Sequence, residues 1–160
     1  MTYPEPRYLR PTGESTARLR RADSDPDFIY RNGTTVDYLA TGSTIDGLFG
    51  LYRWTMGPTL SGFGSHFHRT ISESFFVLSG SIRIFDGERW QDTHAGDFVH
   101  VPAGGIHGFR NESGASASML IHFAPGAPRE DYFEGLAGLD AMSDAERAAF
   151  FAFHDNLWLE

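Results

Sequence analysis

The chain contains no cysteine, has few clustered basic residues, and includes no apolar run that approaches the length of a membrane span. Without cysteine, disulfides and thiolate metal sites are excluded, and the redox compartment leaves no mark on the sequence. A membrane-spanning helix needs about 20 apolar residues, and the opening "MTYPEPRYLRPTGEST" lacks the apolar core of a signal peptide. We therefore expect a cytoplasmic protein with no membrane partner.

The charge balance is acidic, with a formal net charge of −8 at pH 7. The basic cluster "RLRR" at 18–21 lies in a polar N-terminal stretch, and we interpret it as a solvated segment. Phosphate binding requires a basic patch. The sequence therefore predicts no nucleic-acid partner.

The composition suits one domain with a packed interior, because the chain has 160 residues of which 41% are hydrophobic. Short β-prone runs alternate with turn residues, a pattern typical of an antiparallel sandwich or barrel. The runs lie within 28–40 (a hairpin on Asn32-Gly33), 47–56, 73–92 (two strands), 96–111 and 116–125. Residues 58–65, punctuated by Pro58, Gly62 and Gly64, are predicted to form a loop.

Helical patterns occur near the end of the chain. A short helix is predicted around 129–138, and Ser143 with Glu146 forms a capping box for a second one. Phe150, Phe153 and Leu157 are expected to share one face of that second helix. We expect these helices to cover an open side or edge of the barrel.

Histidines and one glutamate form the most informative pattern. Residues i and i+2 of a strand point to the same face, so His66 and His68 are expected to project together, away from Phe67. Glu73 follows at the start of the next strand, and His107 comes directly after a Pro-Gly turn. Three imidazoles and a carboxylate suit one divalent first-row metal, namely Fe, Mn, Co, Ni or Zn. Glu73 either ligates this metal or acts as a general base.

Two motifs of the cupin family fall on these same residues. The first, G(X)5HXH(X)3–4E(X)6G, is matched up to Gly80, although Leu60 stands at the position of the leading glycine. The second, G(X)5PXG(X)2H(X)3N, is matched without substitution from Gly96 to Asn111. The chain thus resembles a single-domain cupin, an all-β double-stranded β-helix or jelly-roll barrel. The resemblance implies that the three histidines and the glutamate converge on one metal ion inside the barrel.

The resemblance also implies a division of the chain into three parts and a homodimer. Residues 1–40 would form an N-terminal arm and first strands that contact a second copy. Residues 41–127 would form the cupin barrel, and residues 128–160 a C-terminal helical segment.

Further side chains are candidates for the wall of an apolar pocket around the metal. Alternation places Phe75 and Val77 on the face of Glu73, and Phe109 on the face of His107. Tyr52 and Trp54 share a strand face and form either pocket wall or outer-sheet packing. His100 and His122 are weaker candidates for the pocket.

The expected function follows from the site and from the resemblance. An aromatic-lined cavity suits a small hydrophobic aromatic or polyketide-like molecule. The chain resembles bacterial quercetinase-like and polyketide-tailoring cupins, which implies a dioxygenase acting on a planar phenolic or enolic substrate. A non-redox isomerase or polyketide cyclase, and a small-molecule-binding protein without catalysis, are the alternatives.

Overall fold

Residues 2–159 are described by a computed structural model, and within them the chain forms two antiparallel sheets. The six-stranded sheet has the order β1 (Phe28–Ile29), β2 (Thr35–Ala40), β3 (Gly50–Met56), β10 (Ala117–Ala124), β5 (Ser72–Ser79) and β8 (Phe98–Val101). The five-stranded sheet has the order β11 (Leu157–Trp158), β4 (Ser61–Phe67), β9 (His107–Asn111), β6 (Ser81–Phe85) and β7 (Trp90–His94). The predicted barrel of two antiparallel sheets is therefore confirmed.

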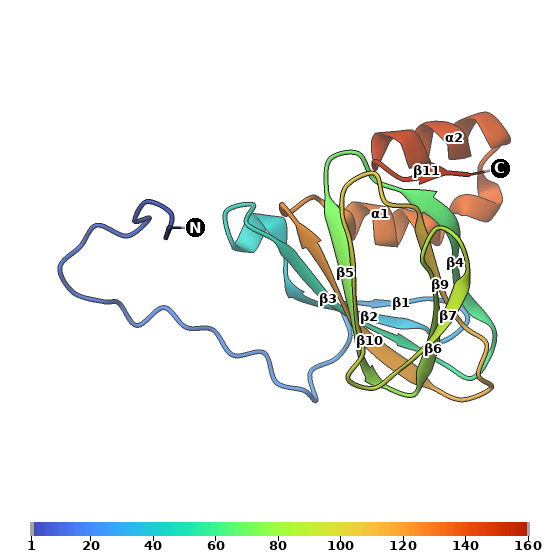
Figure 1. Cartoon of the computed structure of the whole chain (residues 1–160), viewed down its shortest axis with the longest axis horizontal. Coiled ribbons are helices and arrows are strands. Elements are labelled where there is room, and N and C mark those ends of the chain that lie inside the picture. The colour runs from blue at the N-terminus through green and yellow to red at the C-terminus, as the bar shows by residue number, and fades with distance from the viewer. Residues whose placement is uncertain (1, 160) are drawn as a thin grey trace.

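The helices lie together at one end of this barrel (Figure 1). They are α1 (Arg129–Leu136) and α2 (Asp144–Phe153), with the short 3-10 turn η2 (Leu139–Ala141) between them in sequence. A further 3-10 turn, η1 (Gly42–Thr44), lies apart from them in the connection between β2 and β3 (Figure 1). The first part of the described chain runs away from the barrel as an extended segment (Figure 1), whereas Arg20, Ala22 and Asp27 are bonded to β2 and β3. A dimer contact through residues 1–40 stays a prediction.

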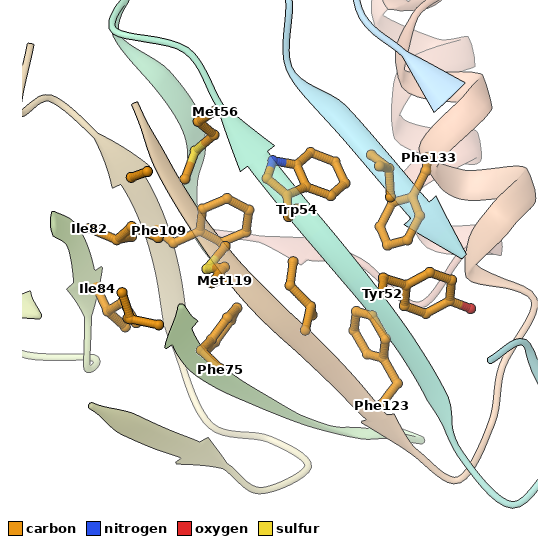
Figure 2. Packing of buried hydrophobic residues seen from close by; sticks show 14 of the residues in the cluster. Tyr52, Trp54, Met56, Phe75, Ile82, Ile84, Phe109, Met119, Phe123 and Phe133 are labelled. Carbon is orange, nitrogen blue, oxygen red and sulfur yellow. The ribbon is translucent and has the colours of Figure 1, made fainter. Parts of the chain in front are cut away.

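Strand β3 shows how the sequence builds the core. Its residues alternate between buried and half-buried, and Tyr52, Trp54 and Met56 all lie on the buried face. Figure 2 shows these side chains together inside the barrel, with Phe133 of α1 opposite them. The ring of Phe133 packs edge-on against Tyr52 at 5.1 Å and Trp54 at 5.2 Å between centroids. Helix α1 thus closes the barrel with aromatic contacts, and Tyr52 and Trp54 belong to the interior rather than to the outer face.

The predicted loop over 58–65 is wrong for most of its length, because residues 61–67 form strand β4. One of the two glycines that indicated a loop, Gly62, is required by close packing against β9. Gly62 has a φ of +139°, and a Cβ there would lie 2.2 Å from the Phe109 carbonyl oxygen. The register between β4 and β9 shifts between Phe63 and His66, as in a β-bulge. After this shift, His66 pairs directly with His107 of β9.

The C-terminal helices begin where the sequence predicts, but the residues of α2 that face the core differ from those expected. The capping box of Ser143 with Glu146 is present at the start of α2. However, Phe153 is 83% exposed, and Leu157 lies in β11 because the chain leaves the helix after Phe153. Phe150, together with its neighbour Phe151, packs against the core instead.

The run over 73–92 holds three strands rather than two, because residues 90–94 pair with β6 as strand β7. No helix within residues 2–159 is both long enough and apolar enough to cross a bilayer. The cytoplasmic location stays a prediction.

Candidate metal centre

The structure brings the three histidines and the glutamate of the two motifs together. His66, His68, Glu73 and His107 each offer one ligand atom, and these atoms all lie within 4.8 Å of one another. All four residues are buried, with exposed fractions of 5% or less. Four polar side chains gathered in a barrel lined by aromatic rings need a common partner, because buried polar groups are costly when unpaired.

Both sheets contribute to this cluster. His66 near the end of β4 stands directly opposite His107 at the start of β9. His68 follows the last residue of β4, and its carbonyl oxygen accepts a hydrogen bond from the Gly104 amide at 2.7 Å. Glu73 is the second residue of β5, in the other sheet, beside Phe123 of β10. The cluster therefore lies where one end of each sheet faces the other.

Each histidine has its Nδ1 engaged by a backbone carbonyl. The partner of His66 is Gly64 at 3.0 Å, and that of His107 is Gly105 at 3.0 Å. His68 Nδ1 lies 2.6 Å from the carbonyl oxygen of Asp155. Because a carbonyl only accepts, each Nδ1 carries the proton and donates it. In the neutral form of each ring, Nε2 is then left with a lone pair directed to the cluster.

These lone pairs face the carboxylate of Glu73. Its Oε2 lies 2.7 Å from His107 Nε2 and 3.0 Å from His68 Nε2. An imidazole lone pair and a carboxylate oxygen are both acceptors, so a cation has to lie between them, either a proton or a metal ion. One divalent ion satisfies the carboxylate and the imidazoles at once.

The spacing of the cluster fits such an ion. Ligand atoms that lie about 2.1 Å from one ion and at right angles to each other are about 3 Å apart. The two distances from Glu73 Oε2 are close to this value. Nitrogen and carboxylate donors together suit Fe, Mn, Co, Ni or Zn, as expected from the sequence. The four residues thus fit the implied metal in number, donor type and spacing.

Electrostatics favour the ligand forms of His66 and Glu73 but oppose that of His107. Burial lowers the pKa of His66 to about 3, so this ring stays neutral. Burial raises the pKa of Glu73, but His107 and His68 outweigh this and hold the pKa well below its ordinary range. Burial lowers the pKa of His107, but the Glu73 carboxylate outweighs it, so that the net pKa is raised. Below this raised pKa, His107 of the metal-free protein holds a proton that a metal ion must displace.

This proton makes metal binding dependent on pH. The contact of protonated His107 with Glu73 stabilises the metal-free fold at acidic pH and is lost as pH rises through the raised pKa of His107. We expect metal affinity to fall about tenfold per pH unit below that pKa, with up to one proton released per ion bound. Calorimetric titration in two buffers of different ionisation enthalpy measures the proton release. An affinity that is the same from about pH 5.5 to pH 8 contradicts the prediction.

The cavity beside the cluster is lined mainly by aromatic side chains, as expected, but it is small. Its volume is about 10 Å³, which is room for roughly one water molecule. The lining residues are Trp54, Phe63, His66, Glu73, Phe109, Ile121, Phe123, Arg129, Tyr132 and Phe133. A second cavity of about 190 Å³ shares Trp54 and Phe63 as walls and opens to the surface between the β1–β2 hairpin, β4 and the segment 136–139. These two rings therefore separate the buried cluster from the open cavity.

The predicted pocket residues fall into two groups. Trp54 and Phe109 line the small cavity, and the ring of Phe75 lies 5.9 Å from that of His107. Tyr52 and Val77 are buried in the core without lining that cavity.

His100 and His122 lie outside the barrel, so the pocket role expected for them is wrong. His100 is exposed and its Nδ1 lies 2.9 Å from the hydroxyl of Ser74. His122 alternates with the buried Ile121 and Phe123, and its ring lies 5.4 Å from that of Phe49 on the outer face of β10. Both side chains point away from the four clustered residues.

The sequence reasoning missed the contribution of the C-terminal segment. Arg129 and Tyr132 of α1 line the small cavity. Trp158 of β11 pairs with His66, and their rings lie 5.0 Å apart. Asp155, besides binding His68 through its carbonyl, accepts hydrogen bonds from the Arg69 and Thr70 amides through its carboxylate. No local pattern reports these contacts, because each partner is distant in sequence.

Asp155 is expected to orient a metal ligand without touching the metal. Asp155→Ala removes the carboxylate that fixes residues 69–70 and so loosens the carbonyl that holds His68. We expect metal affinity to fall about 10- to 100-fold, as for other outer partners of ligands. A competition titration against a chelator measures the change, with the exposed Asp140→Ala as a control that leaves affinity unchanged. Equal affinities in both variants contradict this role.

Comparison with known proteins agrees with this geometry. A family model described as a cupin domain matches residues 52–123, which include all four clustered residues. KdgF from Halomonas sp. is 13% identical, with 74% of this chain and 99% of that chain covered at a TM-score of 0.61. A predicted oxalate decarboxylase from Thermotoga maritima is 18% identical, with coverages of 68% and 99% and a TM-score of 0.61.

The polyketide cyclase RemF from Streptomyces resistomycificus is 22% identical, with coverages of 70% and 81% and a TM-score of 0.58. A search of curated proteins by sequence found no match. At these identities the solved structures show the fold alone. Residues 52–123 therefore match a cupin domain, and the chain shares the fold of these solved structures.

Proposed function

We propose that the protein is a metal-dependent dioxygenase that acts on a planar phenolic or enolic compound of the flavonol type. The observation that carries the proposal is the buried cluster of three imidazoles and one carboxylate within an aromatic lining. A divalent transition ion in this ligand set supplies Lewis acidity, which lowers the pKa of a coordinated hydroxyl group.

The side chains have distinct parts in this reaction. His66, His68 and His107 hold the ion through Nε2, with their rings fixed by backbone carbonyls. Glu73 is placed to receive the proton of the substrate hydroxyl, because its carboxylate stays ionised beside the histidines. The substrate anion that results is electron-rich and reacts with dioxygen, which leads to ring cleavage.

The cavity walls decide how such a substrate is held. The space beside Glu73 takes one oxygen-sized group, whereas the open cavity beyond Trp54 and Phe63 has about 190 Å³. We propose that the substrate's planar body lies on the side of the open cavity and that the two rings turn aside to admit its reacting edge. The surrounding aromatic rings then exclude water and orient the anion.

Oxygen consumption tests the proposal. Protein purified without added metal is analysed for its metal content, loaded with single ions, and screened in an oxygen electrode against planar polyphenols. We expect oxygen uptake that depends on both the ion and the substrate. Fully loaded protein that consumes no oxygen with any member of the panel contradicts the dioxygenase.

A non-redox isomerisation or polyketide cyclisation is the second candidate. The same ligand set binds redox-inert Zn²⁺, and the Glu73 carboxylate serves equally as a base in a reaction that uses no oxygen. RemF, a polyketide cyclase, has a similar fold. Turnover under strict anaerobiosis favours this candidate, and tight binding without turnover favours a binding protein that lacks catalysis.

A further inference from the structure

Arg129 is a buried cation without a charged hydrogen-bond partner in the part of the chain that the structure describes. Its side chain is 3% exposed. Nη1 donates to the carbonyl of His154 at 2.8 Å, and Nη2 donates to Oδ1 of Asn156 at 2.9 Å. Both acceptors are neutral, and Nε has no hydrogen-bond partner within residues 2–159. Buried charges are normally paired by direct contact, whereas the carboxylates of Glu73 and Asp155 act on this guanidinium through space, without a hydrogen bond within residues 2–159.

The position of Arg129 shows where an anion would contact it directly. Arg129 lines the same small cavity as His66 and Glu73. Its Cζ lies 4.1 Å from the centre of the Tyr132 ring and 4.9 Å from that of Phe123. The rings and the two carbonyl-type acceptors fix the guanidinium at the cavity wall. A group bound in the cavity therefore meets a donor that is already in place.

The charges of the site point to the same class of ligand. Glu73 contributes one negative charge, the neutral imidazoles contribute none, and Arg129 contributes one positive charge. A divalent ion leaves these three groups with an excess of two positive charges in a buried cavity that has room for roughly one water molecule. A neutral ligand leaves this excess uncompensated, whereas an anion offsets it.

We propose that Arg129 binds an anionic oxygen of the substrate, which makes the substrate an acidic compound rather than a neutral one. The inference rests on the proposed function, because it concerns the substrate of that same site. The expected substrates are planar aromatic or polyketide-like molecules that carry a carboxylate or a second ionised hydroxyl beside the reacting oxygen. Arg129 is thus a specificity-determining residue, and its contacts with His154 and Asn156 serve to hold it in position.

Binding of a minimal anion tests this inference without turnover. Formate carries the charged group alone, and formamide is its neutral counterpart with the same number of heavy atoms, so both probes need the same opening of the small cavity beyond the space of one water molecule. The protein is loaded with Co²⁺, and each probe is titrated while the visible spectrum is followed. We expect wild-type protein to bind formate at least about tenfold more tightly than formamide. Equal binding of the two probes, or no binding of formate, overturns the inference without any variant.

Three variants separate charge recognition from structure. Arg129→Met should weaken formate binding about 10- to 100-fold and leave formamide binding unchanged, whereas Arg129→Lys should retain part of the preference. The matched control is Arg147→Met, because Arg147 also donates to a backbone carbonyl, that of Leu139, but lies on α2 outside the small cavity. We expect wild-type affinity in that control. Unchanged formate affinity in Arg129→Met overturns the inference.

A measurement on metal-free protein supplies an independent readout. Formate should raise the melting temperature of chelator-treated wild-type protein more than formamide at equal ionic strength, and this difference should be absent in folded Arg129→Met. A difference that persists in the variant counts against Arg129. None of these measurements uses oxygen, so a negative dioxygenase assay does not change their result. Conversely, a lack of formate recognition contradicts the role of Arg129 without contradicting the dioxygenase.

Discussion

His107→Ala is expected to lose its metal ion and all metal-dependent turnover. His107 is 1% exposed, and its Nε2 lies closest to the Glu73 carboxylate, at 2.7 Å. Removing this ligand leaves an incomplete site, so metal content should fall from about one ion per chain to below about a tenth after dialysis. The Glu73 carboxylate also loses a buried partner, which destabilises the metal-free fold by about 3–5 kcal/mol. Elemental analysis and thermal melts measure the two effects.

A second histidine provides the control for this experiment. His100→Ala removes an exposed imidazole on the outer face of the same barrel. It should keep the full metal content and a melting temperature close to that of the wild type. If His107→Ala binds an ion as tightly as His100→Ala does, the cluster is not the metal site.

Glu73→Gln is expected to separate metal binding from proton transfer. The amide has nearly the size of the carboxylate, and the three imidazoles remain in place, so a weakened site should still take up metal at high concentration. The amide cannot accept the substrate proton, and the rate should fall about 100- to 10,000-fold. Steady-state rates of metal-saturated protein, measured with the substrate found by the oxygen screen, test this.

The matched control here is Glu134→Gln, because Glu134 is exposed and accepts a hydrogen bond from Tyr38 far from the cluster. Its rate should equal that of the wild type. A full rate in metal-saturated Glu73→Gln would remove Glu73 from the mechanism and leave it only a ligand.

The strands that could be predicted are those whose alternation is complete. In β3, Tyr52, Trp54 and Met56 share a face because successive residues of a strand alternate, and the structure buries that face. In β4 the alternation is hidden, because Gly62 and Gly64 indicate a loop from sequence alone. The close approach of β9 that requires Gly62 is a tertiary contact, and no local pattern encodes it.

The same distinction applies to the site. His66 and His68 share a face by their spacing, and the motifs supplied Glu73 and His107. His122 could have been placed correctly, because Met119, Ile121 and Phe123 mark the inner face of its strand and leave the histidine outside. Arg129 and Asp155 could not be assigned, since Arg129 meets Glu73 across 56 residues of chain and Asp155 meets His68 across 87.

The contact between His68 and Asp155 has a consequence for how the protein matures in the cell. The two residues are 87 positions apart, so the carbonyl that orients this imidazole is synthesised long after the imidazole itself. A nascent chain can pair most of its strands before Asp155, whose carbonyl orients His68, has been translated. Loading of the ion is therefore expected as a late event, after release from the ribosome, and ribosome-bound chains that stop short of residue 155 should retain metal poorly.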